Sequence, residues 1–170
     1  MTRGTVGGMS SPSPLLAQMA ALADAHADAL RAPVRAFDIG GRPFDPDERP
    51  ALMGVVNLSR DSWYRESVSP SPEAAIRRGR VLAAQGALIV DIGAESTLAG
   101  AARVSPADQL AGVLPVIEGL RADGIPTSVE TYSPDVARVA LGAGAAVLNL
   151  TGVEREDEMY ATAAEHDAAV

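Results

Sequence analysis

A repeated unit along residues 50–170 limits what this chain can fold into. The unit is a short apolar segment, a polar turn, a Ser-Pro pair and a helix-like stretch that ends near a glycine. Ser71, Ser105 and Ser133 each precede a proline, and serine as N-cap with proline at N1 favours a helix start. Short apolar segments bounded by turn residues predict buried strands. These segments are Ala51–Asn57, Ala87–Gly93, Pro126–Thr131 and Ala145–Leu150.

Strands that alternate with helices predict an α/β fold with parallel strands and right-handed crossovers. A doubly wound sheet and a (β/α)8 TIM barrel both fit this order. We favour the barrel, because a β-hairpin predicted around Gly40 and Gly41 could close a barrel floor. A complete barrel needs about 250 residues, so the chain is interpreted as its N-terminal portion. His166–Val170 resembles the opening of a fifth strand.

The predicted organisation has three parts. Residues 1–13 are rich in glycine and serine and are expected to form a disordered tail. Residues 14–49 hold an N-terminal helix, from Pro14 to about Leu30, and the hairpin. Residues 50–170 form the barrel portion. Gln18 and Asp24 interrupt the apolar N-terminal stretch, which argues against a signal peptide and favours a cytoplasmic protein.

Composition excludes several classes of function. The net charge of −8 argues against a broad basic surface for nucleic acid or anionic membrane. The chain has no cysteine, which excludes disulfides, thiolate catalysis and cysteine–metal sites. All fourteen basic residues are arginine, so this segment offers no lysine for Schiff-base chemistry.

Polar residues stand at the end of every predicted strand, where α/β proteins usually place their sites. A barrel would bring these ends to one rim rich in carboxylates and amides. Such a rim suits a heterocycle with N–H donors, because a carboxylate can accept two parallel N–H bonds. Asn57 and Thr131 have alternative structural readings, as a turn residue and a helix-approach hydroxyl. The strand-end residues are Asn57, Asp61, Ser62, Asp91, Glu95–Thr97, Glu130, Thr131, Asn149 and Thr151.

Four motifs, in order and at matching spacing, resemble the pterin-binding barrel family and most closely its dihydropteroate synthases. The resemblance runs from about Pro50 to the end of the chain. The motifs are Met53-Gly54-Val55-Val56-Asn57 followed by Asp61-Ser62, Asp91-Ile92-Gly93 followed by Glu95-Ser96-Thr97, Ser128-Val129-Glu130-Thr131, and Leu148-Asn149.

The resemblance implies an enzyme that condenses hydroxymethyl-dihydropterin pyrophosphate with 4-aminobenzoate in folate biosynthesis. It implies Mg²⁺ as cofactor, held with the pyrophosphate by Asn57. It further implies small-molecule substrates only, and a homodimer formed through the C-terminal half that this chain lacks.

The family also implies roles for the other matching positions. Asp61 and Ser62, in a loop that closes over the site, would be catalytic. Asp91, Glu130 and Asn149 would bind the pterin. Ser96 and Thr97 would lie beside the aminobenzoate.

Departures from the family pattern keep other functions open. Leu98 stands where the family has an arginine that faces the anionic substrate, and Arg60 could substitute for it. Glu130 replaces a shorter aspartate. A condensing enzyme with a different arene or leaving group, or a non-catalytic pterin-binding paralogue, is therefore an alternative. A methyltetrahydrofolate-dependent methyltransferase is less favoured, because Val55-Val56 stands where that group carries Glu-Arg.

Overall fold

The computed structural model describes residues 13–33, 35–46, 48, 50–59, 61–62, 64–98, 100–152 and 154–170. The chain divides into two compact units, Met1–Arg35 and Ala36–Val170. The expected disordered tail, apart from residue 13, lies outside the described residues. Among the described residues, no helix has both the length and the apolar character needed to cross a bilayer.

The first unit contains two helices, α1 (Pro14–Ala25) and α2 (Ala27–Arg31). Ser13 caps α1, its hydroxyl accepting a hydrogen bond from the N–H of Leu16 at 3.3 Å. The prediction of one continuous helix to Leu30 is wrong, because His26 leaves the helical conformation at φ −117°. Histidine has a modest helix propensity, and no buried face in this unit compensates for it.

The predicted hairpin is confirmed as strands β1 (Phe37–Ile39) and β2 (Arg42–Phe44). Gly40 and Gly41 both have positive φ, as the favoured two-residue hairpin turn requires. A Cβ on Gly40 would lie 3.0 Å from Cβ of Ala146 and 3.6 Å from Cβ of Pro126, so the turn packs beside the segments that lead into two strands. The hairpin thus contacts the amino end of the sheet, as a barrel floor would.

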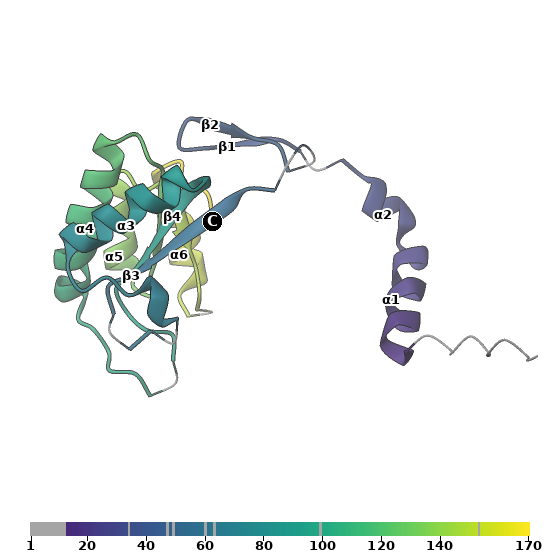
Figure 1. Ribbon diagram of the computed structural model, residues 1–170, viewed down its shortest axis with the longest axis horizontal. Coiled ribbons are helices and arrows are strands. Elements are labelled where there is room, and N and C mark those ends of the chain that lie inside the picture. The colour runs from purple at the N-terminus through teal and green to yellow at the C-terminus, as the bar shows by residue number, and fades with distance from the viewer. Residues whose placement is uncertain are drawn as a thin grey trace, which may run out of the picture. The chain divides into compact units, whose positions relative to one another are not determined.

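The four predicted strands form one parallel sheet in the order β3-β4-β5-β6. Figure 1 labels its first two strands, β3 and β4. A doubly wound sheet reverses its strand order, whereas a barrel adds each strand beside the previous one. Ala169 continues the series by pairing in parallel with Val147 of β6. The sheet is therefore the N-terminal part of a barrel. The strands are β3 (Leu52–Asn57), β4 (Ala87–Gly93), β5 (Thr127–Glu130) and β6 (Val147–Asn149).

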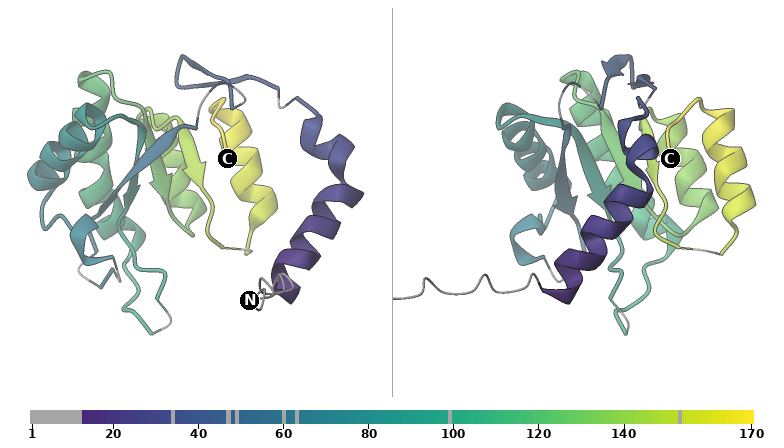
Figure 2. Two further views of the ribbon diagram at one scale, coloured as in Figure 1. Left: turned by 45° about the vertical axis from the view of Figure 1, so that its right-hand side comes forward. Right: turned by 90° about the vertical axis from the view of Figure 1, so that its right-hand side faces the viewer.

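Helices follow the strands and pack against one another in chain order (Figure 2). The three Ser-Pro starts are confirmed: the hydroxyls of Ser71, Ser105 and Ser133 each accept a hydrogen bond from an N–H in the first turn. The sequence analysis did not identify the last helix or a short 3-10 turn. The helices are α3 (Pro72–Ala84), α4 (Pro106–Ala122), α5 (Pro134–Gly142) and α6 (Glu156–Glu165), and the 3-10 turn is Arg65–Ser67.

The core lies between the sheet and these helices. Alternate strand residues, including Val56, Ile92, Val129 and Leu148, are fully buried there with the apolar side chains of the helices. Because successive side chains point to opposite faces of a strand, the residues between them face the other side of the sheet. That face carries the polar residues of the candidate site.

Candidate active site

Two rows of residues in register form the floor of the candidate site. Asn57, Gly93, Glu130 and Asn149 are paired across the four strands at their carboxyl ends. Two residues earlier, Val55, Asp91, Ser128 and Val147 are paired in the same way, so both rows share one face. A cavity of about 450 Å³ lies against these rows. It is lined by Val55, Asn57, Ser62, Tyr64, Asp91, Glu95, Ser96, Thr97, Glu130 and Asn149.

Gly93 leaves room for two oxygen atoms in the row at the carboxyl ends of the strands. A Cβ at this position would lie 2.8 Å from Oδ1 of Asn57 and 2.8 Å from Oε2 of Glu130. Any larger residue would push one of these side chains away from the floor. The glycine therefore allows both acceptors to lean over the centre of the row.

The orientation of the Asn57 amide follows from two serines. Its Nδ2 donates to Oγ of Ser62 at 3.1 Å and to Oγ of Ser67 at 2.7 Å. Ser67 in turn donates to the carbonyl of Tyr64 at 2.6 Å. With both amide hydrogens used, Oδ1 is left as an acceptor above Gly93.

Asp91 is the most buried carboxylate of the site, with 3% of its surface exposed. Its Oδ2 accepts a hydrogen bond from Nδ2 of Asn149 at 3.1 Å. Burial raises the pKa of Asp91, and the nearby Ser128 hydroxyl and Asn149 amide oppose that shift. Ser128 nevertheless forms no hydrogen bond of acceptable geometry with it, and Oδ1 of Asp91 has no partner among the described residues.

Glu130 lies beside Asp91 and shares its low-dielectric surroundings. Burial, together with the negative charge of Asp91, raises the pKa of Glu130 to about 7. The pair therefore offers both a buried acceptor and a carboxyl group that changes protonation near neutral pH. A ligand with N–H donors would stabilise the charged forms of both.

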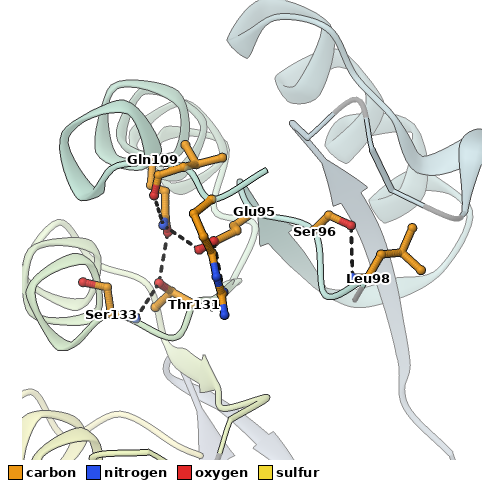
Figure 3. A network of polar contacts seen from close by, with 8 residues as sticks. Glu95, Ser96, Leu98, Gln109, Thr131 and Ser133 are labelled. Carbon is orange, nitrogen blue, oxygen red and sulfur yellow. Dashed lines mark hydrogen bonds and ion pairs between the residues drawn. The ribbon is translucent and has the colours of Figure 1, made fainter. Parts of the chain in front are cut away.

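A separate polar network fixes the loop that follows β4 (Figure 3). Oε2 of Glu95 accepts a hydrogen bond from Nε2 of Gln109 at 2.9 Å, and Oε1 accepts one from Arg103 at 3.2 Å. Thr131 donates to Oε1 of Gln109 at 3.1 Å and accepts a hydrogen bond from the N–H of Ser133 at the same distance. The network joins the ends of β4 and β5 to helix α4.

The structure brings seven of the eight predicted site residues to one cavity. The exception is Asp61, which borders a different cavity beside Leu58 and Ser59. Its carbonyl accepts a hydrogen bond from the Ser96 hydroxyl at 3.1 Å, so the two loops are joined through its backbone. Arg60, the suggested replacement for the missing arginine, lies outside the described residues.

Three residues that build or border the site were not predicted from the sequence, and a fourth, Glu95, was named among the strand-end residues without a specific role. Tyr64 lines the cavity, and Glu95, Arg103 and Gln109 form the network beside it. Gln109 is 2% exposed and lies on the buried face of α4, whose other residues are apolar. A single polar residue on an apolar helix face is visible in the sequence, and because a buried polar group needs a partner it could have been predicted to join a polar network. Arg103 carried no comparable signal, because its partners depend on the shape of the loop.

Comparison with known proteins decides the family. The profile described as "Pterin binding enzyme" matches residues 53–170. The chain belongs to the pterin-binding enzyme family. This finding confirms the resemblance inferred from the four motifs.

Individual family members support the same assignment. The chain is 43% identical to a probable bifunctional folylpolyglutamate synthase/dihydropteroate synthase of Halobacterium salinarum, over 76% of this chain and 16% of that protein. It is similar to dihydropteroate synthase from Xanthomonas albilineans with 4-aminobenzoic acid, at 38% identity and a TM-score of 0.66, covering 78% of this chain and 49% of that one. The Thermus thermophilus enzyme in complex with 6HMPPP gives 38% identity and a TM-score of 0.63, covering 79% and 47%. The chain thus spans about half or less of these pterin-binding enzymes.

Proposed function

We propose that this chain carries the pterin-binding half of a dihydropteroate synthase, which condenses hydroxymethyl-dihydropterin pyrophosphate with 4-aminobenzoate. The observation that supports the proposal best is the cluster of Asp91, Glu130 and Asn149 on one face of the sheet. Asp91 Oδ1 is buried with no partner among the described residues, which is costly unless a ligand supplies a donor. A pterin presents such N–H donors along one edge.

In this reaction the amine nitrogen of 4-aminobenzoate attacks the methylene carbon of the pterin ester. A carbon–nitrogen bond forms, the carbon–oxygen bond to pyrophosphate breaks, and the amine loses a proton. Asp91, Glu130 and Asn149 would hold the pterin edge, while Ser62, Ser96 and Thr97 would border the reacting atoms. Asp61 would act only through its loop, since its side chain lies beside another cavity. Orientation of two bound reactants can account for much of such catalysis.

Mg²⁺ belongs to the same proposal, with Asn57 as its protein ligand. The site fits a lightly held magnesium ion, because Mg²⁺ often uses one or two protein oxygens with waters and substrate phosphates. Oδ1 of Asn57 is oriented by Ser62 and Ser67, and the described residues contain no group of three or more His, Cys, Asp or Glu that could hold a metal by themselves. Bound Mg²⁺ would neutralise charge on the departing pyrophosphate. The cytoplasmic location and the homodimer expected from the sequence are parts of the proposal too.

A second candidate is a condensing enzyme that uses a different arene. Leu98 favours it, because 46% of its surface is exposed at a position where the family pattern has an arginine. The pterin half of the reaction would be unchanged. A panel of aromatic amines, tested with the pterin ester, separates the two candidates.

Calorimetric titration of the complete gene product with hydroxymethyl-dihydropterin pyrophosphate tests the proposal. We expect binding that depends on Mg²⁺ and that falls by about tenfold to a hundredfold in Glu130→Gln, the range for a hydrogen bond to a charged group. Glu165→Gln, which removes a surface carboxylate paired with Arg138, is the matched control and should bind as the wild type does. Binding without any effect of Mg²⁺ would indicate a non-catalytic pterin-binding protein. Unchanged affinity in Glu130→Gln would refute the role of that carboxylate.

A further inference from the structure

Tyr64 brings an aromatic ring to the wall of the candidate active site. It lines the cavity of about 450 Å³, and 47% of its surface is exposed. Among the described residues that line this cavity, Tyr64 is the one aromatic residue and Val55 the one aliphatic residue. Every other described lining residue is polar or charged. The cavity therefore offers many hydrogen-bond partners and few apolar contacts.

A planar heterocycle needs two kinds of contact from such a cavity. Its edge can donate hydrogen bonds to the carboxylates of the floor, but its two faces gain most from aromatic or apolar side chains. Val55 belongs to the floor, where it is in register with Asp91 of the neighbouring strand. Tyr64 belongs to the loop that follows β3, so its ring is the one in this wall that a heterocycle face can use.

The backbone of Tyr64 is tied to the floor through Ser67, which is fully buried. Both the hydroxyl and the N–H of Ser67 donate to the carbonyl of Tyr64, at 2.6 Å and 3.1 Å. Because its hydroxyl hydrogen is used there, Oγ of Ser67 can only accept from Asn57, whose Nδ2 lies 2.7 Å away. The carbonyl of Tyr64 thus decides which way the Asn57 amide is turned, and one hydroxyl joins the loop to the floor.

The segment after Ser67 is joined to the same asparagine by its main chain. Val68 pairs in parallel with Asn57, and the N–H of Ser69 donates to the Asn57 carbonyl at 2.8 Å. A side-chain substitution at Ser69 leaves that backbone contact in place, whereas one at Ser67 removes the hydroxyl that holds Tyr64. The two serines therefore separate the effect of the hydroxyl from the fold of the loop.

We propose that Tyr64 is a further substrate-binding residue whose ring packs on the face of the bound heterocycle, and that Ser67 is the residue that positions it. The proposal rests on the proposed function, because it takes the heterocycle to be a pterin held at its edge by Asp91, Glu130 and Asn149. It assigns to Tyr64 a selectivity that the floor cannot provide. The floor recognises N–H donors, and Tyr64 recognises a flat aromatic ring.

Calorimetry with the complete gene product and 6-hydroxymethylpterin, which has the ring but no pyrophosphate, tests the role of Tyr64. In Tyr64→Ala we expect about a tenfold loss of affinity, the lower part of the range for a base stacked on an aromatic side chain, because Tyr64 is half exposed. Tyr64→Phe keeps the ring and should bind as the wild type does. Inorganic pyrophosphate with Mg²⁺, which has no ring, should bind equally to wild type and Tyr64→Ala. Tyr160→Ala is the matched control, since Tyr160 lies on α6 at 48% exposure.

Ser67→Ala tests the positioning role with the same two ligands. It keeps the N–H that donates to Tyr64 but frees the Asn57 amide to turn. We expect about a threefold loss for 6-hydroxymethylpterin, the lower end of the range for one hydrogen bond. Unlike Tyr64→Ala, this variant should also bind pyrophosphate with Mg²⁺ less tightly, which loss of the ring alone would not cause. Ser69→Ala is its control and should match the wild type, and equal losses in the two serine variants would refute the positioning role.

Equal affinity of wild type and Tyr64→Ala for 6-hydroxymethylpterin would overturn the assignment of Tyr64, and so would an equal loss in Tyr160→Ala. If the pterin ester binds with Mg²⁺ dependence but ignores the loss of Tyr64, the proposed function stands and the assignment fails. If 6-hydroxymethylpterin binding depends on Tyr64 while Mg²⁺ has no effect on the pterin ester, the proposed function fails and the assignment stands.

Discussion

Two buried carboxylates near the end of the same strand differ in how their oxygens are used. Asp91 lies within β4 at 3% exposure, and Glu95 lies just past the end of that strand at 8% exposure. Both oxygens of Glu95 have partners, Gln109 and Arg103. Asp91 has one partner, Asn149, and one oxygen with none among the described residues.

We infer that the difference separates a side chain that stabilises the fold, Glu95, from one that is available to bind a ligand, Asp91. A buried polar atom without a partner costs free energy in the folded state, whereas a completed network stabilises it. Glu95 therefore belongs to the hydrogen-bond network that joins the ends of β4 and β5 to α4. Asp91 carries a cost that binding of an N–H donor would remove. The contrast can be tested by removing one carboxylate at a time.

The largest expected effect is on pterin binding in Asp91→Asn. The amide keeps the shape of the carboxylate but removes its charge, so affinity for the pterin ester should fall by about a hundredfold, the upper end for a charged hydrogen bond in a buried site. The free energy of unfolding should stay equal or rise, because the desolvated charge is gone. Calorimetry and urea denaturation of the same preparation give both numbers. A large fall in the free energy of unfolding would mean that Asp91 stabilises the fold, as Glu95 does.

Glu95→Ala should show the opposite behaviour. It removes one of the two acceptors of Gln109 Nε2, which keeps only the carbonyl of Val104, and it removes the hydrogen-bond partner of Arg103. We expect the free energy of unfolding to fall by about 2 kcal/mol, the middle of the range for an unsatisfied buried partner. Urea denaturation measures the loss, and Glu165→Ala is the control, because it removes an exposed carboxylate that is also paired with an arginine. Equal destabilisation by the two variants would contradict the role of the network.

The pH dependence of stability sharpens the comparison at Glu130. Burial and the charge of Asp91 raise its pKa from 4.5 to about 7, so between these values the folded protein binds a proton that the unfolded chain has released. The free energy of unfolding contributed by this group therefore falls as pH rises through that window. Glu130→Gln cannot titrate, so its stability relative to wild type should increase from pH 4.5 to pH 7. We expect about 1–2 kcal/mol, less than the full shift implies, because the carboxyl group is only half buried.

Denaturation of both proteins at several pH values provides the measurement. The difference between the two curves cancels the titration of groups that do not interact with Glu130, so it reports on Glu130 and its neighbour Asp91. A flat difference across the window would show that folding does not raise the pKa of Glu130. A difference that shrinks with rising pH would reverse the assigned sign.

The floor of the candidate site could be predicted from the sequence, because it depends on local patterns of apolar and polar residues along each strand. Asn57, Asp91, Glu130 and Asn149 each end or interrupt an apolar run, and parallel strands bring such positions to one edge. The Ser-Pro helix starts were predictable for the same reason. The network around Glu95 was not, because its contacts with Arg103 and Gln109 depend on how a loop folds back on α4. The break at His26 was missed since helical spacing alone does not mark where a helix with no buried face ends.

The smallest expected effect is on the free energy of unfolding when one of two buried threonines is replaced. Thr127 begins β5, and Thr131 directly follows it. Oγ1 of Thr131 donates to Gln109 and accepts from the N–H of Ser133, whereas Oγ1 of Thr127 is buried with no partner among the described residues. Valine has nearly the shape of threonine without the hydroxyl. Thr131→Val should therefore lower the free energy of unfolding by about 1 kcal/mol, while Thr127→Val should leave it unchanged or raise it. Chemical denaturation of the two variants measures the difference, and a loss at Thr127 as large as that at Thr131 would show that partners do not decide which polar groups stabilise this fold.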